Sequence, residues 1–208
     1  MQIPNNRRPK VSGASIFFTV ALAQRGGDLL VREIDRLRDA LNVELGEYPF
    51  CVDALVVLPD HLHAVWTLPD GDADFSARWG RIKSRFSRQL PIGDLRRSHR
   101  LRRERGIWQR RFWEHHIRGP ADYRRCVQYC WINPVKHGLV TRAVDWPYSS
   151  IHRDIRLGLV EPEWSGVVPE GEFGEMVGMM FEDPGYALCV CQPNSERPNL
   201  ALVFWKLK

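Results

Sequence analysis

The chain has 208 residues, of which 44% are hydrophobic, and its formal net charge at pH 7 is +5. A chain of this length buries one good core, so we expect one domain, with or without an appendage, and not two full domains. No apolar run approaches the ~20 residues that cross a bilayer, and the polar residues 1–10 lack the apolar stretch of a secretory signal. The sequence therefore predicts a cytoplasmic protein with no membrane partner.

The five cysteines are an odd number and contain no CxxC pair. This pattern suits reduced thiols better than a disulfide framework. Cys126 and Cys130 are four residues apart, the spacing of neighbours on one helical face, so a zinc site that uses both is an alternative.

Positive charge is concentrated in one block of the sequence. Between Arg78 and Arg118, fourteen arginines and lysines stand against three acids, a balance of +11, so the other residues together carry −6. Such a block usually marks a polyanion site, because each cation placed near a phosphate releases condensed counterions. The alternative is a solvated, flexible basic loop.

The first half of the chain predicts three strands and one helix. Residues 14–23 are rich in β-branched and aromatic side chains and predict a buried strand. Residues 28–45 have apolar side chains at intervals of three and four, which predicts an amphipathic helix. Residues 50–58 and 62–68 are two apolar runs separated by Pro-Asp-His, which predicts adjacent strands joined by a tight hairpin.

The next segments complete the predicted fold. A second helix is expected over residues 74–90, with one apolar stripe and one arginine stripe. Residues 91–106 predict a basic loop, and residues 106–118 predict a fourth strand. The order strand, helix, strand, strand, helix, strand predicts an α+β fold, a ferredoxin-like sandwich whose antiparallel sheet has helices on one side.

An added helix that carries a tyrosine is expected after this sandwich. It begins near Pro120 and runs through Tyr129. The Asn-Pro dipeptide at 133–134 is expected to end or kink it, because proline biases the preceding residue away from the α region. We divide the chain into a domain over residues 1–169 and an acidic C-terminal tail over residues 170–208.

His61 and His63 are separated by one residue at the head of the third strand. Successive side chains of a strand alternate faces, so both imidazoles are expected on one face. Two same-face imidazoles can hold a divalent metal. The alternative is a pair of ordinary strand-end histidines that form hydrogen bonds.

Tyr129 and Asn133 are four residues apart and share one helical face, which places a hydroxyl nucleophile beside a neutral oxygen ligand. Tyr123 competes, but it lies about 120° around the helix from Tyr129, so only one of the two can face the metal. The neighbouring Asn133 favours Tyr129. Alternatively, Tyr129 is a core aromatic residue with a paired hydroxyl.

These residues are suited to phosphoryl transfer. Two imidazoles and an amide oxygen leave coordination positions for phosphate oxygens, and the metal polarises the scissile phosphate. A tyrosine hydroxyl that attacks phosphorus gives a covalent 5′-phosphotyrosine intermediate and a free 3′-hydroxyl. The chain contains no GxxxxGK[ST] loop, in agreement with a reaction that needs no ATP.

Six segments resemble, in the same order, segments of the REP-associated tyrosine transposases, a branch of the HUH single-tyrosine transposases. They are FFTVALAQR, LPDHLHAVWTLPDGDADFSARW, IKSRFSR, GIWQRRFWEHHIR, YCWINPVKHGLV and DWPYSS, and the resemblance covers about residues 7–165. It implies that His61 and His63 bind a divalent metal, Mg²⁺ or Mn²⁺, and that Tyr129 is the nucleophile. Asn133 is implied as a third ligand, at a position where some relatives have Gln. Histidine ligands alone do not exclude Zn²⁺.

The resemblance also implies a partner, single-stranded DNA hairpins of repetitive extragenic palindromes with a short flanking tetranucleotide. Both a monomer and a homodimer are compatible with it. Guanidinium and ammonium groups suit phosphates, and DNA contacts are expected from Arg78, Arg81, Lys83, Arg85, Arg88, Arg110, Arg111 and Lys136. Residues 175–208 resemble no segment of the family.

Two other functions are alternatives to a metal-dependent DNA strand transferase. One is a non-catalytic regulator that binds hairpin nucleic acid. The other is a metal-dependent hydrolytic nuclease with water as the nucleophile, which has no need of Tyr129.

Overall fold

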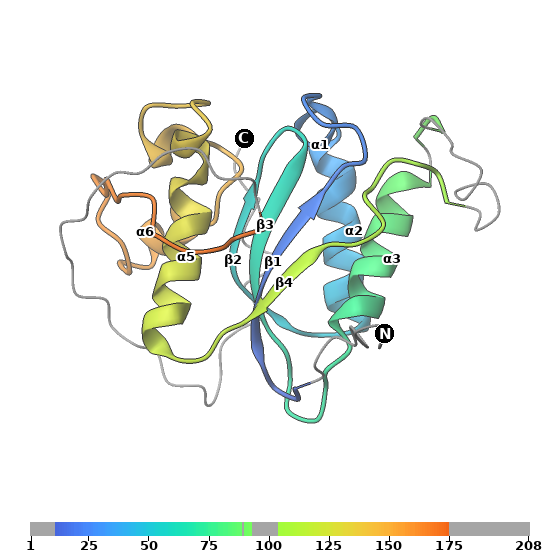
Figure 1. The fold of residues 1–208 in the computed structure, drawn as a ribbon, viewed down its shortest axis with the longest axis horizontal. Coiled ribbons are helices and arrows are strands. Elements are labelled where there is room, and N and C mark those ends of the chain that lie inside the picture. Colours follow the sequence, from blue (N-terminus) through green and yellow to red (C-terminus); the bar gives the residue numbers. More distant parts are fainter. Residues whose placement is uncertain (1–10, 89, 93–103, 175–208) are drawn as a thin grey trace, which may run out of the picture.

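Four strands and the helices between them follow the predicted order (Figure 1). The computed structural model describes residues 11–88, 90–92 and 104–174. One antiparallel sheet has the strand order β2-β3-β1-β4 and consists of β1 (Ser15–Ala21), β2 (Cys51–Val57), β3 (His61–Thr67) and β4 (Trp113–His116). The helices are α1 (Leu29–Arg32), α2 (Ile34–Glu47), α3 (Phe75–Ser87), α5 (Pro120–Lys136), α6 (Ile151–Arg156) and the 3-10 helix η1 (Ala143–Asp145). The ferredoxin-like α+β prediction is confirmed.

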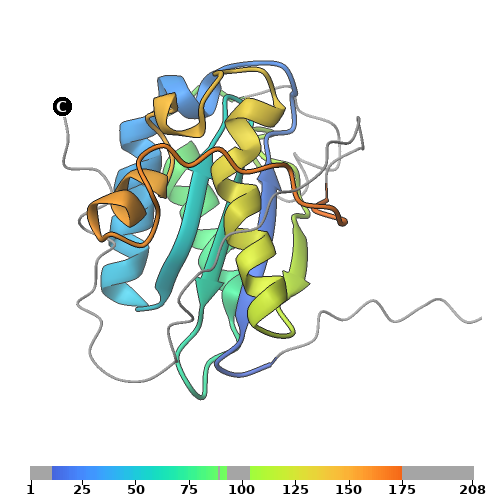
Figure 2. The same cartoon turned by 90° about the vertical axis from the view of Figure 1, so that its left-hand side faces the viewer.

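Both faces of the sheet are buried, with α2 and α3 on one face and α5 on the other (Figure 2). Alternation along β1 supplies both cores, because Ile16 and Phe18 pack toward α2 and α3 whereas Phe17 packs toward α5. In the first core, Trp66 of β3 stacks on Trp79 of α3 with ring centroids 4.1 Å apart. The sheet thus separates this core from the face on which the tyrosine-bearing helix packs.

The helix predicted over residues 28–45 is divided into α1 and α2. Glu33 lies between them with non-helical dihedral angles, φ −105° and ψ 31°. The amide of Leu30 in α1 donates to the carbonyl of Pro59 at 3.0 Å, which ties α1 to the β2–β3 hairpin. The apolar spacing alone predicts one continuous helix and does not signal the break at Glu33.

The Asn-Pro dipeptide is expected from the sequence to end or kink the tyrosine-bearing helix. The helix α5 continues through it, so an end at residue 133 is wrong. Pro134 lies in the last turn, and α5 ends at Lys136. The carbonyls of Asn133 and Pro134 accept from the amides of His137 and Leu139 at 3.0 and 2.9 Å. Asn133 and Pro134 are buried, and packing outweighs the local preference of the residue before proline.

Within the described part of the chain, no helix is both long enough and apolar enough to cross a membrane.

Candidate functional site

The two histidines of β3 lie on the face of the sheet that α5 covers. In the register of the sheet, His63 is opposite Thr19 and His61 is opposite Ala21. The two imidazole rings have centroids 5.1 Å apart, and both side chains are buried. The same-face prediction is confirmed.

Each imidazole ring is oriented through its Nδ1 atom. His63 Nδ1 lies 2.8 Å from the Thr19 hydroxyl, which itself donates to the backbone carbonyl of Phe173 at 2.6 Å. A hydroxyl has one proton, so the Thr19 oxygen accepts from a protonated His63 Nδ1. His61 Nδ1 lies 2.6 Å from a carboxylate oxygen of Asp60, an acceptor, and is protonated for the same reason.

Arg25 Nη2 also lies near His61 Nδ1, at 3.4 Å, where both groups would have to be donors. The shorter bond to Asp60 decides the tautomer, and Arg25 pairs with Asp60 through Nε at 2.9 Å. Burial alone would raise the pKa of Asp60, but the Gly26 amide, the His61 ring and the Arg25 charge together hold it below its ordinary value. Asp60 is therefore a carboxylate at neutral pH.

In the neutral form of each ring, protonation of Nδ1 leaves the lone pair on Nε2. A metal-binding histidine has this tautomer when its other nitrogen donates to a carboxylate or hydroxyl partner. The residues present therefore fit the divalent metal that the resemblance implies.

Replacing Asp60 by alanine is expected to weaken Mn²⁺ binding by about 10- to 100-fold, the usual cost of losing the partner that orients a ligand. Asp70→Ala removes an exposed acid of the following turn and is the matched control. Isothermal titration calorimetry of the metal-free proteins with Mn²⁺ measures the affinity of each variant. Equal affinities for Asp60→Ala and the control would mean that Asp60 does not orient a ligand.

Tyr129 of α5 packs against the histidines. Its ring centroid lies 5.2 Å from that of His63, and Lys136 Nζ donates to its hydroxyl at 2.6 Å. Of the two candidate tyrosines, Tyr129 is thus the one whose ring contacts His63. Lys136, one of the predicted DNA contacts, therefore lies at the phenol oxygen.

Two further residues of the same segment are close to the site. Asn133, one helical turn after Tyr129, is fully buried. His137, which follows α5, has its ring centroid 5.0 Å from that of His61. Asn133 as a metal ligand stays a prediction.

Phe173 covers Tyr129. Their rings are stacked with centroids 3.7 Å apart and planes 9° apart, and Phe173 also meets Phe17 edge to face. Tyr129 is only 1% exposed. The described end of the predicted tail, residues 170–174, therefore contacts the site through Phe173; residues 175–208 lie outside the described part of the chain.

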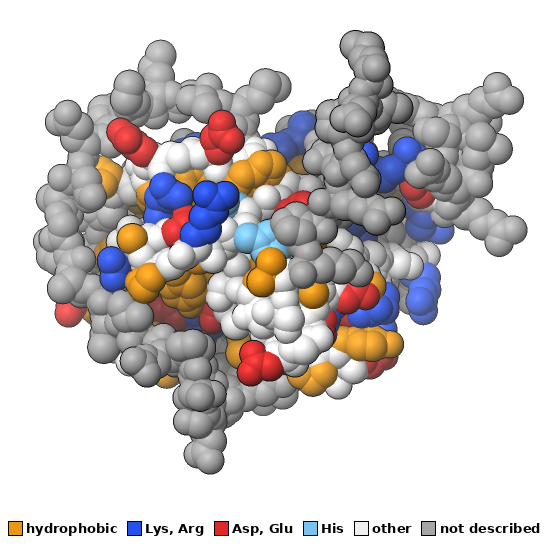
Figure 3. Space-filling view, turned by 60° about the horizontal axis from the view of Figure 1, so that its bottom comes forward, with side chains coloured by type: hydrophobic (Ala, Val, Ile, Leu, Met, Phe, Trp, Pro, Cys, Tyr) orange, Lys and Arg blue, Asp and Glu red, His pale blue; other side chains and the backbone are white. Residues whose placement is uncertain are grey.

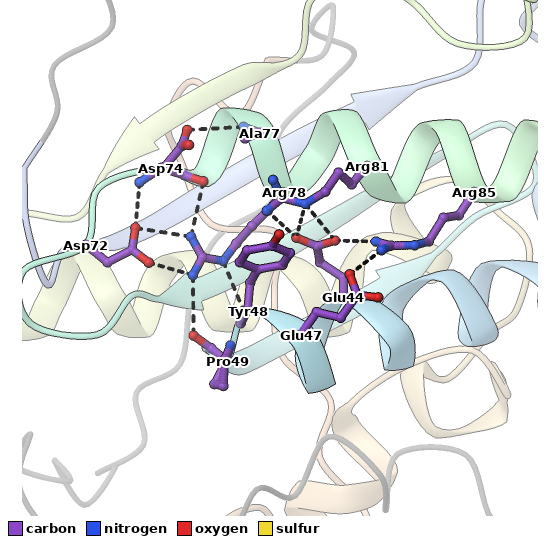
Figure 4. Close-up of polar contacts among 10 residues, drawn as sticks. All are labelled: Glu44, Glu47, Tyr48, Pro49, Asp72, Asp74, Ala77, Arg78, Arg81 and Arg85. Atoms are coloured by element: carbon purple, nitrogen blue, oxygen red, sulfur yellow. Dashed lines mark hydrogen bonds and ion pairs between the residues drawn. The ribbon is translucent and has the colours of Figure 1, made fainter.

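Three arginines predicted to contact DNA pair with carboxylates of this chain (Figure 4). Arg78 is 4% exposed and donates to Asp72 at 2.6 Å, so its guanidinium is buried in an ion pair and does not face solvent. Arg81 and Arg85 both donate to Glu44 of α2, whose side chain is fully buried. These ion pairs join α2 to α3. Loss of both arginines would leave the Glu44 carboxylate buried without a cation, which costs stability.

The other predicted cations differ in their surroundings. Lys83 donates to a backbone carbonyl at 3.0 Å and Arg110 pairs with a glutamate at 2.9 Å, whereas Arg88 and Arg111 are exposed. On the face shown in Figure 3, the coloured Lys and Arg side chains lie among acids and do not form one uniform patch. Residues 93–103, which hold much of the basic block, lie outside the described residues. DNA contacts from these side chains stay predictions.

Sequence reasoning missed three residues of the site, Thr19, Asp60 and Phe173. Asp60 could have been found from its position directly before the histidine pair. Thr19 could have been found by aligning the first strand with the third in antiparallel register. No signal in the sequence indicates that Phe173 lies on Tyr129.

A ferredoxin-like sheet that brings a His-Leu-His strand together with a tyrosine on an added helix defines the class of HUH single-tyrosine transposases. No family model matches the chain. A REP-associated tyrosine transposase of Escherichia coli (strain K12) is 43% identical over 171 residues, which cover 82% of this chain and 96% of the relative. A relative in Haemophilus influenzae, described as of the same kind, is 40% identical over 164 residues, 78% of this chain and 93% of that protein.

A solved structure of a REP-associated tyrosine transposase bound to a REP hairpin has a TM-score of 0.73 to this chain and is 42% identical in sequence. The match covers 84% of this chain and 99% of that one. The chain belongs to the family of REP-associated tyrosine transposases.

Proposed function

We propose that this protein cleaves and rejoins single-stranded DNA at palindromic hairpins through a covalent bond to Tyr129. The observation that carries the proposal is the convergence of Lys136, the Tyr129 phenol and the two imidazoles on one buried point between α5 and β3. A hydrolytic nuclease needs no phenol at this place, and a binding protein needs neither the phenol nor oriented imidazoles. The hairpin bound to the similar solved structure supports the choice of DNA partner.

In the proposed reaction the Tyr129 oxygen attacks the scissile phosphorus. A bond forms between phosphorus and the phenol oxygen, whose proton passes to solvent, while the bond to the 3′-oxygen breaks and that oxygen takes up a proton from solvent. The downstream strand is then held as a 5′-phosphotyrosine, and the upstream strand leaves with a 3′-hydroxyl. Lys136, 2.6 Å from the phenol oxygen, stabilises the negative charge that the nucleophile acquires when it loses its proton. Attack by a 3′-hydroxyl reverses these steps and rejoins the strands.

His61 and His63, with Asn133 as the third ligand, are the proposed holders of Mg²⁺ or Mn²⁺. Such an ion supplies Lewis-acid polarisation of the phosphate oxygens. Asp60 and Thr19 hold the two rings in the tautomer that this role requires. All these groups come from one chain, which supports action as a monomer over a site shared in a homodimer.

The test is to locate the covalent bond. A REP hairpin oligonucleotide with single-stranded flanks and a 3′-end label is incubated with the protein and Mn²⁺ or Mg²⁺, and the label is expected to transfer to protein. Trypsin separates the candidates, because Tyr129 falls in the peptide over residues 126–136 and Tyr123 falls in the peptide over residues 119–124. The DNA adduct is expected on the first peptide.

Each alternative gives a different result in the same experiment. Release of 5′-phosphate ends with no labelled protein would indicate a hydrolytic nuclease. Tight hairpin binding with neither cleavage nor adduct, unchanged in His61→Ala/His63→Ala, would indicate a regulator without catalytic activity.

A further inference from the structure

A cluster of three metal-ligating side chains lies apart from the histidine pair. His115 comes from the edge strand β4, and Asp122 and Cys126 come from the first two turns of α5. One possible ligand atom from each residue lies within 4.8 Å of the others. In the part of the chain that the structure describes, no other group of three His, Cys, Asp or Glu side chains meets this condition.

The Asp122 carboxylate is held in place by its neighbours. Its Oδ2 atom lies 2.7 Å from His115 Nε2 and accepts from the Arg118 amide at 3.0 Å, while Oδ1 accepts from Arg125 at 2.7 Å. Burial alone would raise the pKa of Asp122, but these hydrogen bonds hold it below its ordinary value. The group is therefore an oriented carboxylate at neutral pH, as metal-binding carboxylates are.

Cys126 adds a soft donor to the cluster. Its side chain is 1% exposed, and burial, with a smaller contribution from the Asp122 charge, raises the pKa of the thiol to about 12. A coordinated cation displaces the thiol proton and stabilises the thiolate, and the proton goes to solvent. The side chains of His115 and Asp122 are 26% and 14% exposed, which gives an ion a path from solvent.

We propose that His115, Asp122 and Cys126 form a second metal site, which binds Zn²⁺ or a similar transition-metal ion and joins β4 to the start of α5. Imidazole, carboxylate and thiolate are the ligands that zinc takes in proteins, and a thiolate disfavours the hard ion Mg²⁺. Three protein ligands in a tetrahedral site leave the fourth position to water. Because one ligand is on the strand and two are on the helix, the ion fixes the helix that carries Tyr129 against the sheet.

The donor set differs from that of the histidine pair, and also from the Cys126 and Cys130 pair that spacing alone suggests. Cys130 is fully buried and is not a member of the cluster. A hydrogen-bonded His115–Asp122 pair beside an inert thiol is the rival explanation without an ion. Cobalt distinguishes these possibilities, because a thiolate bound to Co²⁺ gives a near-ultraviolet charge-transfer band that imidazole and oxygen ligands do not give.

The experiment uses the full chain with Cys51, Cys189 and Cys191 replaced by serine, so that the thiols left are those of Cys126 and Cys130. This reference protein is freed of metal, checked for folding by circular dichroism, and titrated with Co²⁺. The charge-transfer band is expected to appear at one equivalent and to disappear when Zn²⁺ is added. Zn²⁺ is also expected to raise the melting temperature.

Three variants of the reference protein identify the ligands. Cys126→Ser is expected to lose the band and the Zn²⁺-induced rise in melting temperature, whereas Cys130→Ser and His61→Ala/His63→Ala are expected to keep both. His115→Ala, made at a half-buried position, is expected to weaken Co²⁺ binding at least about 10-fold. Losing a residue that only orients a ligand already costs about this much in metal affinity, so losing a ligand is expected to cost no less.

No band in the folded reference protein overturns the proposal, whatever the variants do. A band that survives Cys126→Ser, or that is lost in Cys130→Ser while that variant remains folded, overturns it as well. Loss of the band in His61→Ala/His63→Ala would place the ion at the histidine pair of β3 and would also overturn the proposal. None of these outcomes bears on the adduct at Tyr129, so the second metal site and the proposed reaction are tested independently.

Discussion

Replacing Tyr129 by phenylalanine is expected to abolish the covalent protein–DNA adduct and to leave hairpin binding intact. The substitution removes one oxygen, the atom that attacks phosphorus in the proposed reaction. Loss of the nucleophile costs about 10⁶-fold in another enzyme that acts through a covalent intermediate, so a loss of at least about 1000-fold is expected here. A denaturing gel measures labelled protein, and fluorescence anisotropy measures hairpin affinity.

Tyr123→Phe is the matched control for this variant. It removes the same atom from the same helix at a half-buried position six residues earlier. The adduct is expected at the wild-type level. An adduct that persists in Tyr129→Phe and vanishes in Tyr123→Phe would assign the nucleophile to Tyr123, and persistence in both would rule out tyrosine chemistry at this helix.

The parts of the site that follow from periodicity could be predicted from the sequence. A strand alternates faces, so the spacing of His61 and His63 is enough to place both rings together. Spacing alone does not decide between Tyr129 and Tyr123, but the neighbouring Asn133 favours Tyr129, and the ring of Tyr129 does contact His63. Strand order followed from the succession of elements, because short connections leave few topologies.

The parts that depend on packing between distant segments could not be predicted. The arginine stripe of α3 has the spacing of a phosphate-binding face, but Glu44 reaches Arg81 and Arg85 only because α2 packs beside α3. Phe173 was missed for the same reason, because nothing in the sequence places it on Tyr129. Thr19 and Asp60, in contrast, could have been found from the register of the strands and from the position before the histidine pair. Local rules also failed where burial opposed them, as at the Asn-Pro dipeptide of α5.

Replacing Phe173 by alanine is expected to speed formation of the adduct. Tyr129 is 1% exposed under the stacked Phe173 ring, so a phosphodiester reaches the phenol only after the segment that carries Phe173 moves away. Burial of a phenylalanine stabilises by about 1.5–3 kcal/mol and an aromatic pair adds about 0.5–1.5 kcal/mol. In Phe173→Ala the covered state of Tyr129 loses about 2–4 kcal/mol of stabilisation. At 1.4 kcal/mol for each factor of ten, the ratio of uncovered to covered protein rises about 30-fold or more.

Single-turnover adduct formation at saturating hairpin DNA measures this effect, because DNA affinity no longer limits the rate. Glu172→Ala is the matched control, since Glu172 is the exposed neighbour of Phe173 and its loss leaves the stack in place. The sign of the change separates two roles for the ring. If Phe173 only covers the phenol, the rate rises; if the stack holds Tyr129 in the position from which it attacks, Phe173→Ala lowers the rate, and the covering role is refuted. The Thr19 hydroxyl donates to the backbone carbonyl of Phe173, a contact that the alanine substitution keeps. Thr19 can therefore still orient His63 in Phe173→Ala, which favours a rise in the rate.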